Sequence, residues 1–342
     1  MKQIAFTILL LAADPIGLFN AAAAEESLQL NSVKKIWSAG RHNAFTDLIR
    51  FDEKWFCTFR EAEAHVGGNG QIRVLTSSDG EAWRSTASLS EDGVDLRDPK
   101  FSITPDHRLM LVLGGSVYEG KTLKQRQPRV AFSRNGRDWT PPRRVLSEGE
   151  WLWRVTWHQG QAYGISYSSS PAPAAATNTP AGWLVKLFTS DDGVAYRVVT
   201  RLEVPGRPNE ATLRFLENGD CVALLRREGS GEDRAAWIGR SSAPYRDWQW
   251  HSAGMPIGGP NFIVLHHGTM IASGRQYGDR ATGSKTFLGR MTLDGVKSEL
   301  ILPSGGDCSY PGMVWHEGLL WLSYYSSHDG KSEIYLAKVR CP

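Results

Sequence analysis

The sequence predicts an all-β chain that folds as one six-bladed β-propeller, and three observations support this prediction. Six pairs of strand-like segments recur, and their starts are about 50–60 residues apart, which is the length of a four-stranded blade. A short turn pattern built on Asp-Gly or Asn-Gly recurs between these pairs. No segment longer than one or two turns has the apolar period of a helix. We therefore expect six sheets arranged in a ring.

The first 24 residues have the features of a secretory signal peptide. Lys2 supplies the positive charge, an apolar run follows from Ile4 to Ala13, and small residues from Ala21 to Ala24 precede Glu25. The apolar run is too short to span a bilayer. We expect cleavage near Ala24, a periplasmic or secreted product, and one propeller domain over residues 25–342. An uncleaved N-terminal anchor is the alternative.

The six predicted strand pairs divide the rest of the chain evenly. Each first strand ends in an apolar residue before a polar turn, and each second strand returns from it. The pairs are Thr46 to Arg60, Asp98 to Gly114, Leu152 to Tyr167, Glu210 to Arg226, Pro260 to Arg275, and Tyr310 to Tyr325.

The last unit has one further clear strand, Glu333 to Val339. We expect the segment Val33 to Ser38 to supply its missing outer strand, which closes the ring and removes its free edges. The Pro- and Ala-rich stretch Pro171 to Pro180 is expected to be a surface loop of the third blade.

The recurring turn has a Ser, then Asp or Asn, then Gly and an aromatic residue. Its copies are Ser77 to Trp83, Ser133 to Trp139 and Ser190 to Tyr196, so successive copies begin 56 and 57 residues apart. Ser241 to Trp248 is a decayed copy and Thr292 to Gly295 a shorter one. Asp-Gly or Asn-Gly makes the turn, and the aromatic residue packs it back on the sheet. These segments resemble the Asp-box of sialidases and related propellers, in a form one residue shorter.

Composition and charge argue against two classes of ligand, nucleic acids and nucleotides. The 342 residues carry a net charge of +3 and no run of Lys and Arg, which argues against nucleic-acid binding. The segment Gly67 to Gly70 lies in a predicted loop with no helix start to hold a phosphate, so no nucleotide is expected. The 13 Trp and 35 Gly suit short strands and tight turns, and also an aromatic-lined carbohydrate site.

The four cysteines lie in different settings. Cys57 and Cys221 lie inside predicted strands and are expected to be buried thiols. Cys308 and Cys341 are the candidate pair for a disulfide, which export would permit. No Cys-x-x-Cys or His-x-x-x-His spacing occurs, so we predict no metal site and no cofactor.

Alignment of the six pairs places equivalent residues around the central pocket. The first-strand starts include Asp98, Glu210 and Tyr310, and three of the six second-strand ends are arginines: Arg60, Arg226 and Arg275. Arginines bind a planar carboxylate through paired hydrogen bonds. A Tyr nucleophile must lose a proton whose unperturbed pKa is about 10, and a neighbouring carboxylate can accept it. This set predicts a site for a substrate that carries a carboxylate.

Two blades resemble those of exo-α-sialidases in particular. Asn209 to Thr212 with Arg226 is similar to their Glu and Arg strand pair, and Ser309 to Gly312 is similar to their nucleophile blade. The resemblance implies a retaining exo-glycosidase that releases a terminal acidic sugar. It implies that Tyr310 is the nucleophile, that Glu210 is its base, and that Arg226 and Arg275 bind the carboxylate.

The first blade departs from that family, because Arg41 to Leu48 lacks its Arg-Ile-Pro motif. Arg60 or Arg41 is therefore the candidate for the first carboxylate-binding arginine. Asp98 is the first candidate for the acid/base, with Asp47 and the loop Arg60 to His65 as alternatives. The expected substrate-binding set is Arg60, Arg97, Arg226, Arg275, His65, Asp47 and Tyr325.

Two other functions fit the same fold. One is selection of another acidic sugar, such as a uronic acid, by the altered first blade, with His65 or a carboxylate pair as the acid/base. The other is a non-catalytic carbohydrate-binding propeller. The Tyr and Glu pair argues against the second alternative, since a lectin needs no phenolate.

Overall fold

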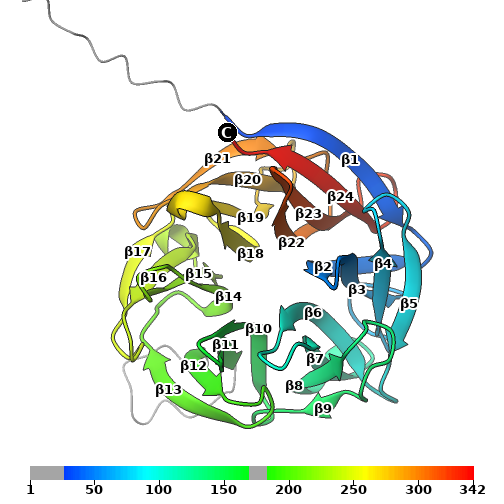
Figure 1. The fold of residues 1–342 in the computed structure, drawn as a ribbon, viewed down its shortest axis with the longest axis horizontal. Helices are drawn as coiled ribbons and strands as arrows, with labels where there is room; N and C mark the ends of the chain where they lie inside the picture. The colour runs from blue at the N-terminus through cyan, green and yellow to red at the C-terminus, as the bar shows by residue number, and fades with distance from the viewer. Residues whose placement is uncertain (1–26, 169–182) are drawn as a thin grey trace, which may run out of the picture.

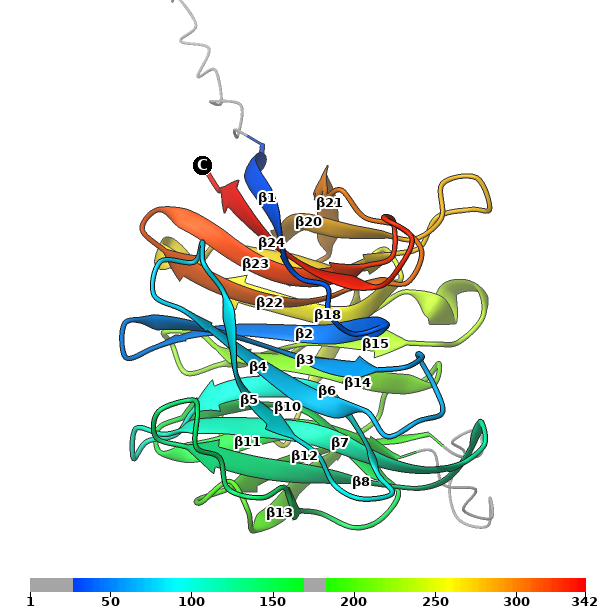
Figure 2. The ribbon, with the colours of Figure 1, turned by 90° about the vertical axis from the view of Figure 1, so that its right-hand side faces the viewer.

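The computed structural model describes residues 27–168 and 183–342, and it confirms an all-β propeller of six four-stranded antiparallel sheets (Figure 1). The predicted signal peptide and the predicted loop Pro171 to Pro180 lie outside the described residues. Among the described residues, no helix is long and apolar enough to cross a membrane. Within each blade the four strands follow one another from the centre of the ring to its rim, and the blades lie side by side around the centre (Figures 1 and 2).

Every predicted strand pair forms the two inner strands of a blade. Blade one contains β2 (His42–Phe51), β3 (Lys54–Ala62), β4 (Gln71–Ser77) and β5 (Arg84–Leu89). Blade two contains β6 (Asp95–Ile103), β7 (Leu109–Glu119), β8 (Thr122–Ser133) and β9 (Arg143–Arg144). Blade three contains β10 (Glu150–His158), β11 (Gln161–Ser168), β12 (Leu184–Ser190) and β13 (Tyr196–Leu202).

The second half repeats this order. Blade four contains β14 (Pro208–Phe215), β15 (Cys221–Arg227), β16 (Trp237–Ser241) and β17 (Gln249–Ser252). Blade five contains β18 (Ile257–Val264), β19 (Met270–Gln276), β20 (Lys285–Met291) and β21 (Val296–Ile301). Blade six contains β22 (Cys308–His316), β23 (Leu319–Ser326), β24 (Glu333–Arg340) and the N-terminal strand β1 (Gln29–Trp37). Two short 3-10 turns, η1 (Gly231–Arg234) and η2 (His266–Gly268), lie between strands.

The ring closes as predicted. Strand β1 pairs antiparallel with β24, with Val33 opposite Ala337 (Figure 1). Lys34 on β1 and Lys338 on β24 both form ion pairs with Glu81 in the turn of blade one, at 3.2 and 2.6 Å. The closing strand therefore covers the edge of blade six and also contacts the neighbouring blade.

The predicted turns join the third and fourth strands of their blades and are held by their own side chains. In the first copy, Asp79 Oδ1 accepts the backbone N–H groups of Glu81 and Ala82, and Trp83 Nε1 donates to the carbonyl of Gly80 at 3.0 Å. These backbone donors lower the pKa of Asp79 to about 2. Trp139 and Trp248 make the same backward bond at 3.1 and 3.0 Å, so the decayed copy keeps the geometry.

All four cysteines are free thiols, which confirms the prediction for buried Cys57 and Cys221 and contradicts the predicted Cys308–Cys341 disulfide. The topology of blade six gives the reason. Cys308 pairs with Ser326, which pairs with Glu333 at the first residue of β24. Cys341 follows the last residue of that strand, so the two thiols lie at opposite ends of the blade.

Candidate active site at the centre of the ring

A β-bulge interrupts the innermost strand of every blade at the same place. In blade six Ser309 pairs with Tyr325 and Gly312 with Ser323, so two residues on β22 lie opposite one on β23. A bulge bends its strand and re-aims side chains. The bulged pairs, in ring order, are Phe45–Thr46, Asp98–Pro99, Trp153–Arg154, Asn209–Glu210, Gly259–Pro260 and Tyr310–Pro311.

These bulges correct the predicted alignment. Asp98 and Tyr310 occupy the first bulge position, whereas Glu210 occupies the second. Arg60 and Arg275 pair with the residue just before their bulges, but Arg226 lies one residue further, opposite its bulge. The prediction that the three arginines share one repeat position is therefore wrong for Arg226. Since neighbouring residues of a strand face opposite sides, a shift of one changes which side chains meet.

Tyr310, Glu210 and Arg226 form a buried, hydrogen-bonded group. The phenol of Tyr310 donates to Glu210 Oε1 at 2.7 Å. Arg226 Nη1 lies 3.2 Å from the phenolic oxygen and 2.9 Å from the same carboxylate oxygen. Burial, together with the charge of Glu210, raises the pKa of Tyr310 well above its ordinary value. The phenol is therefore protonated at rest, and its proton already lies on the path to Glu210.

The backbone of Gly259 contacts both Glu210 and Tyr310. Its backbone N–H donates to Glu210 Oε2 at 2.8 Å, so both carboxylate oxygens have a partner. Its φ is 57°, and an added Cβ would lie 2.6 Å from the ring of Tyr310. Only glycine allows this close approach without strain.

A cavity of about 200 Å³ opens beside Tyr310 and Glu210. Asp98 lies in it, also buried, with a φ of 49°. Burial raises the pKa of its carboxyl above the ordinary value, against the opposing charges of Arg97 and Lys100. The cavity is lined by Phe45, His65, Arg97, Asp98, Ser116, Tyr118, Leu123, Arg126, Trp151, Tyr167, Glu210 and Tyr310.

Arg275 and Tyr325 lie next to this cavity and bind a carboxylate of the protein. Both donate to Asp307 Oδ1, at 2.8 and 2.7 Å, and Arg275 also lies over the ring of Tyr310 at 5.4 Å. Burial opposes ionisation of Asp307, but hydrogen bonds from His42 and His65 and the charge of Arg275 hold its pKa well below the usual range. Sequence reasoning missed both Asp307 and His42.

His42, His65 and Asp307 carry three atoms of metal-ligand type within 4.8 Å of one another, a cluster that spacing in the sequence did not predict. His42 Nε2 and His65 Nδ1 lie 3.1 and 2.7 Å from Asp307 Oδ2. Two imidazoles and a carboxylate can bind a transition metal. The guanidinium of Arg275 on the other carboxylate oxygen opposes a second cation there.

Three further predicted residues are committed to contacts inside the protein. Arg60 is fully buried and binds Asp95 through two nitrogens, at 2.7 and 3.0 Å, and Arg97 binds the same carboxylate at 3.0 Å. Asp47 is fully buried and does not line the cavity, and both its oxygens accept hydrogen bonds from Arg154 at 2.9 to 3.1 Å. Of these three, only Arg97 also lines the cavity.

The β7–β8 hairpin forms one wall of the cavity, and sequence reasoning did not predict it. It brings Ser116, Tyr118, Leu123 and Arg126 to the cavity. No repeated motif marks these residues. They reach the centre because β7 and β8, at 11 and 12 residues, are longer than the other second and third strands. The unusual length of these two strands is therefore the feature of the sequence that could have indicated a wall at the cavity.

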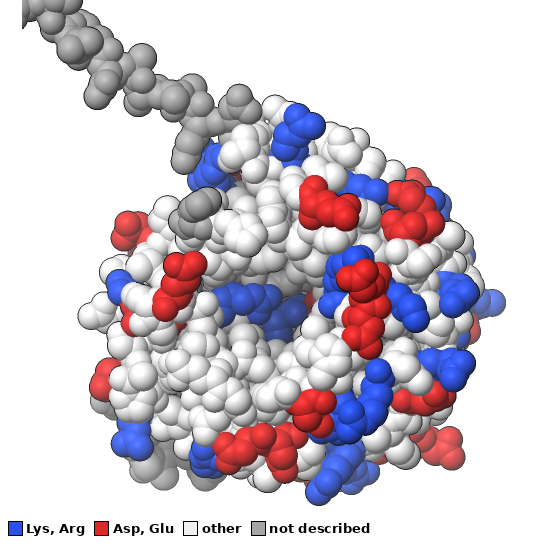
Figure 3. Space-filling view, in the orientation of Figure 1, with Lys and Arg blue, Asp and Glu red and all other residues white. Residues whose placement is uncertain are grey.

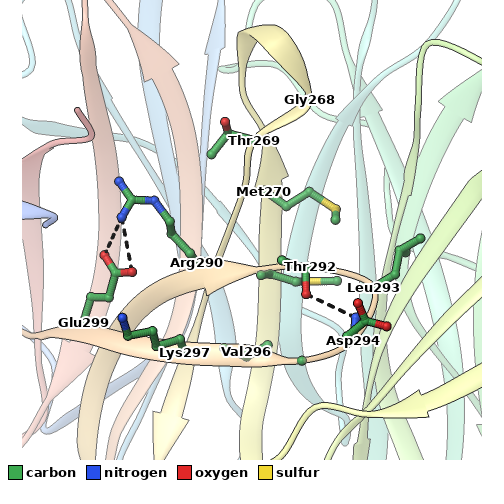
Figure 4. Close-up of a pocket in the computed structure, with 12 residues that line it drawn as sticks. Gly268, Thr269, Met270, Arg290, Thr292, Leu293, Asp294, Val296, Lys297 and Glu299 are labelled. Carbon is green, nitrogen blue, oxygen red and sulfur yellow. Dashed lines mark hydrogen bonds and ion pairs between the residues drawn. The ribbon is translucent and has the colours of Figure 1, made fainter. Parts of the chain in front are cut away.

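The protein has a hollow at the centre of the ring and another at its outer edge. On the face seen in Figure 3, the centre of the ring is hollowed and lined by Lys or Arg side chains. A second hollow of about 690 Å³ lies at the outer strands β20 and β21 of blade five (Figure 4). Its charged pair, Arg290 and Glu299, is 3.1 Å apart, and among the described residues that line it no tyrosine meets a carboxylate as Tyr310 meets Glu210.

The comparisons with known proteins agree on the fold. No protein-family model and no curated protein sequence matches the chain. A solved protein of unknown function from Dyadobacter fermentans is 18% identical, with a TM-score of 0.77 over 92% of this chain and 100% of that one. The Trypanosoma rangeli sialidase in complex with the inhibitor DANA is 12% identical, with a TM-score of 0.68 over 91% of this chain and 58% of that one.

The Fusarium graminearum α-L-arabinofuranosidase Arb93A, with an iminosugar inhibitor, is 14% identical, with a TM-score of 0.67 over 91% of this chain and 98% of that one. Other complexes of these two enzymes contain sialic acid and arabinobiose. This chain thus has the architecture of propeller glycosidases and spans a little over half of the trypanosomal sialidase chain.

Proposed function

We propose that this chain is a retaining glycoside hydrolase that releases a terminal acidic sugar through Tyr310 as nucleophile. The 2.7 Å hydrogen bond from the Tyr310 phenol to Glu210 carries the proposal. A buried phenol with a raised pKa becomes a nucleophile only if a base accepts its proton, and Glu210 is in place to do so. Arg226 then stabilises the phenolate that forms.

The residues divide the reaction as follows. Glu210 accepts the phenolic proton while the Tyr310 oxygen bonds to the anomeric carbon, and Asp98 donates a proton to the departing oxygen. Water then attacks the same carbon, Asp98 accepts its proton, and Tyr310 leaves and regains its own proton from Glu210. The raised pKa of Asp98 suits a group that must begin protonated.

Three further observations support this proposal. The T. rangeli sialidase and the F. graminearum arabinofuranosidase, which share this architecture, act on glycosides by their names. The cavity is smaller than the roughly 300–1,000 Å³ of drug-sized pockets, which suits one terminal sugar ring. Arg126, which lines the cavity, puts positive charge there, which suits an acidic sugar. We also propose that the protein is exported, as its N-terminal sequence predicts.

The test is hydrolysis of aryl sialosides and aryl uronides by the wild-type protein and by Tyr310→Phe. We expect the wild type to release the aryl group from one acidic glycoside and Tyr310→Phe to lose nearly all turnover. Full activity of Tyr310→Phe would end the assignment of Tyr310. Tyr324→Phe serves as the matched control, because Tyr324 is on β23 and its hydroxyl bonds to the Pro303 carbonyl away from the cavity.

A second candidate is a propeller glycosidase for another acidic sugar that uses Asp98 and Glu210 as its carboxylate pair. The observation in its favour is that Arg226 and Arg275 already bind Glu210, Glu228 and Asp307. Cleavage of uronides with retention of activity in Tyr310→Phe would favour it. Ligand binding with no product over long incubation would instead indicate a carbohydrate-binding propeller.

A further inference from the structure

Five arginines near the centre of the ring each form an ion pair with a carboxylate of the protein, and two of them share one carboxylate. Each lies within ion-pair distance of its partner and is at least largely buried. The pairs are Arg60–Asp95, Arg97–Asp95, Arg154–Asp47, Arg226–Glu210 and Arg275–Asp307. A carboxylate on an incoming ligand would have to compete with these pairs.

Arg126 on β8 differs from these five. It lines the cavity together with Asp98, Glu210 and Tyr310, yet it forms no ion pair with any residue of the described ranges. Its Nε donates to the carbonyl of Gly149 at 3.0 Å, which fixes one edge of the guanidinium. Its Nη2 is buried and has no hydrogen-bond partner among the described residues.

Two aromatic rings hold the guanidinium in place. It lies 5.0 Å from the ring centre of Tyr167 and 5.8 Å from that of Trp151, and both rings also line the cavity. A planar guanidinium held this way loses little freedom when it binds a planar anion. A buried donor without a partner is costly, and a ligand oxygen would remove that cost.

We propose that Arg126 receives the carboxylate of the substrate, on the wall built by the β7–β8 hairpin. Ser116 and Tyr118 lie on the same wall and offer hydroxyl groups to the same ligand. Arg226 and Arg275 then act on the nucleophile side, where they contact Tyr310. This inference rests on the proposed function for its substrate class, and it assigns the acid-binding role to a different residue from those that the sequence predicted.

The test compares Arg126→Gln with wild type on an aryl glycoside of an acidic sugar and on the methyl ester of that glycoside. We expect kcat/KM for the charged substrate to fall about 10- to 100-fold, mostly through KM, because one charge-assisted hydrogen-bonded pair is lost. The methyl ester should change less than about threefold, and Arg126→Lys should recover part of the loss. Lys124→Gln is the control, since Lys124 is on the same strand but exposed.

Equal losses on the charged and the ester substrates would overturn the proposal. So would charge selectivity that depends on Arg226 or Arg275 and is unaffected by Arg126→Gln.

A binding measurement separates this inference from the proposed function. Sialic acid and glucuronic acid are titrated into the wild type and Arg126→Gln by calorimetry, which needs no turnover. Binding by the wild type that Arg126→Gln weakens at least tenfold supports the site even if no glycoside is cleaved. Equal binding by both proteins, or no binding of either acid by the wild type, overturns it.

Discussion

The phenolic oxygen of Tyr310 lies 2.7 Å from Glu210 Oε1, although the two residues are 100 positions apart in the chain. They come from the innermost strands of blades six and four, and each occupies a β-bulge. Blade five lies between them and supplies Gly259, which touches both. The nucleophile and its base are therefore positioned by the ring as a whole and not by one local segment.

Glu210→Gln removes the proton acceptor while it keeps the shape of the side chain. We expect a loss of roughly 10²- to 10⁴-fold in kcat, as for other general bases. The double variant with Tyr310→Phe should lose little more than either single variant, because the two residues act as one unit. Steady-state rates of the three variants decide this, and additive losses would separate the two roles.

Asp98→Asn should remove the group that protonates the leaving oxygen. We expect a large loss on substrates with poor leaving groups and a much smaller one on activated aryl glycosides, which need little protonation. Because the protonated form acts first, wild-type kcat/KM should fall as pH rises through the raised pKa of Asp98. That alkaline limb should be absent from the pH profile of Asp98→Asn; an unchanged limb would assign it to another group.

Gly259→Ala should disturb Tyr310 directly, because the new methyl group would lie 2.6 Å from its ring. We expect at least a tenfold loss of activity and a fall of about 1–3 kcal/mol in the free energy of unfolding. Gly254→Ala is the matched control, since Gly254 also has a positive φ, of 78°, but no atom within 4 Å of an added Cβ. Similar losses of activity in both variants would remove the role given to Gly259.

Arg154→Met should leave the carboxylate of Asp47 buried without its partner. We expect the free energy of unfolding to fall by about 3–5 kcal/mol, as measured by urea denaturation. The double variant Arg154→Met, Asp47→Leu should recover much of the loss, because no uncompensated charge remains. Failure of the double variant to recover would indicate that Phe101, whose N–H donates to Asp47 at 2.7 Å, matters more than the ion pair.

Asp307 should make the fold sensitive to acid. Its pKa is held well below the usual range, so the unfolded chain binds a proton there more readily than the folded one. The stability it contributes is present above the ordinary Asp pKa of about 4 and is lost as pH falls below that value. Thermal midpoints at pH 6 and pH 3 should differ less in Asp307→Asn than in the wild type, and an equal difference would contradict this.

The fold was largely predictable because its signals are local. A short polar turn between two apolar segments, such as His316 to Gly318, marks the hairpin of the two inner strands in each blade. The Asp-Gly and Asn-Gly turns mark the junction of the two outer strands. The residues Tyr310 and Glu210 were found by their resemblance to known blades. The packing that sets their contacts required the structure, because a two-residue bulge changes the register without any change in strand spacing.

Arg126 and Asp307 show why the rest of the site could not be predicted. Arg126 differs from the five paired arginines near the centre in having no carboxylate partner among the described residues, and pairing across blades is not visible in the sequence. Asp307 directly precedes β22, where a residue would be read as part of a turn. The predicted disulfide was wrong for a related reason, since a count of cysteines says nothing about which end of a blade each occupies.

Because β1 completes a blade whose other strands come from the far end of the chain, the last sheet cannot assemble until synthesis has passed residue 340. Until then the ring of the earlier blades stays open at the position of blade six. The same arrangement places Gln29, near the start of the described chain, opposite Arg340. Joining them and cutting the chain at an exposed turn elsewhere would yield a circular permutant with the same ring but a different seam.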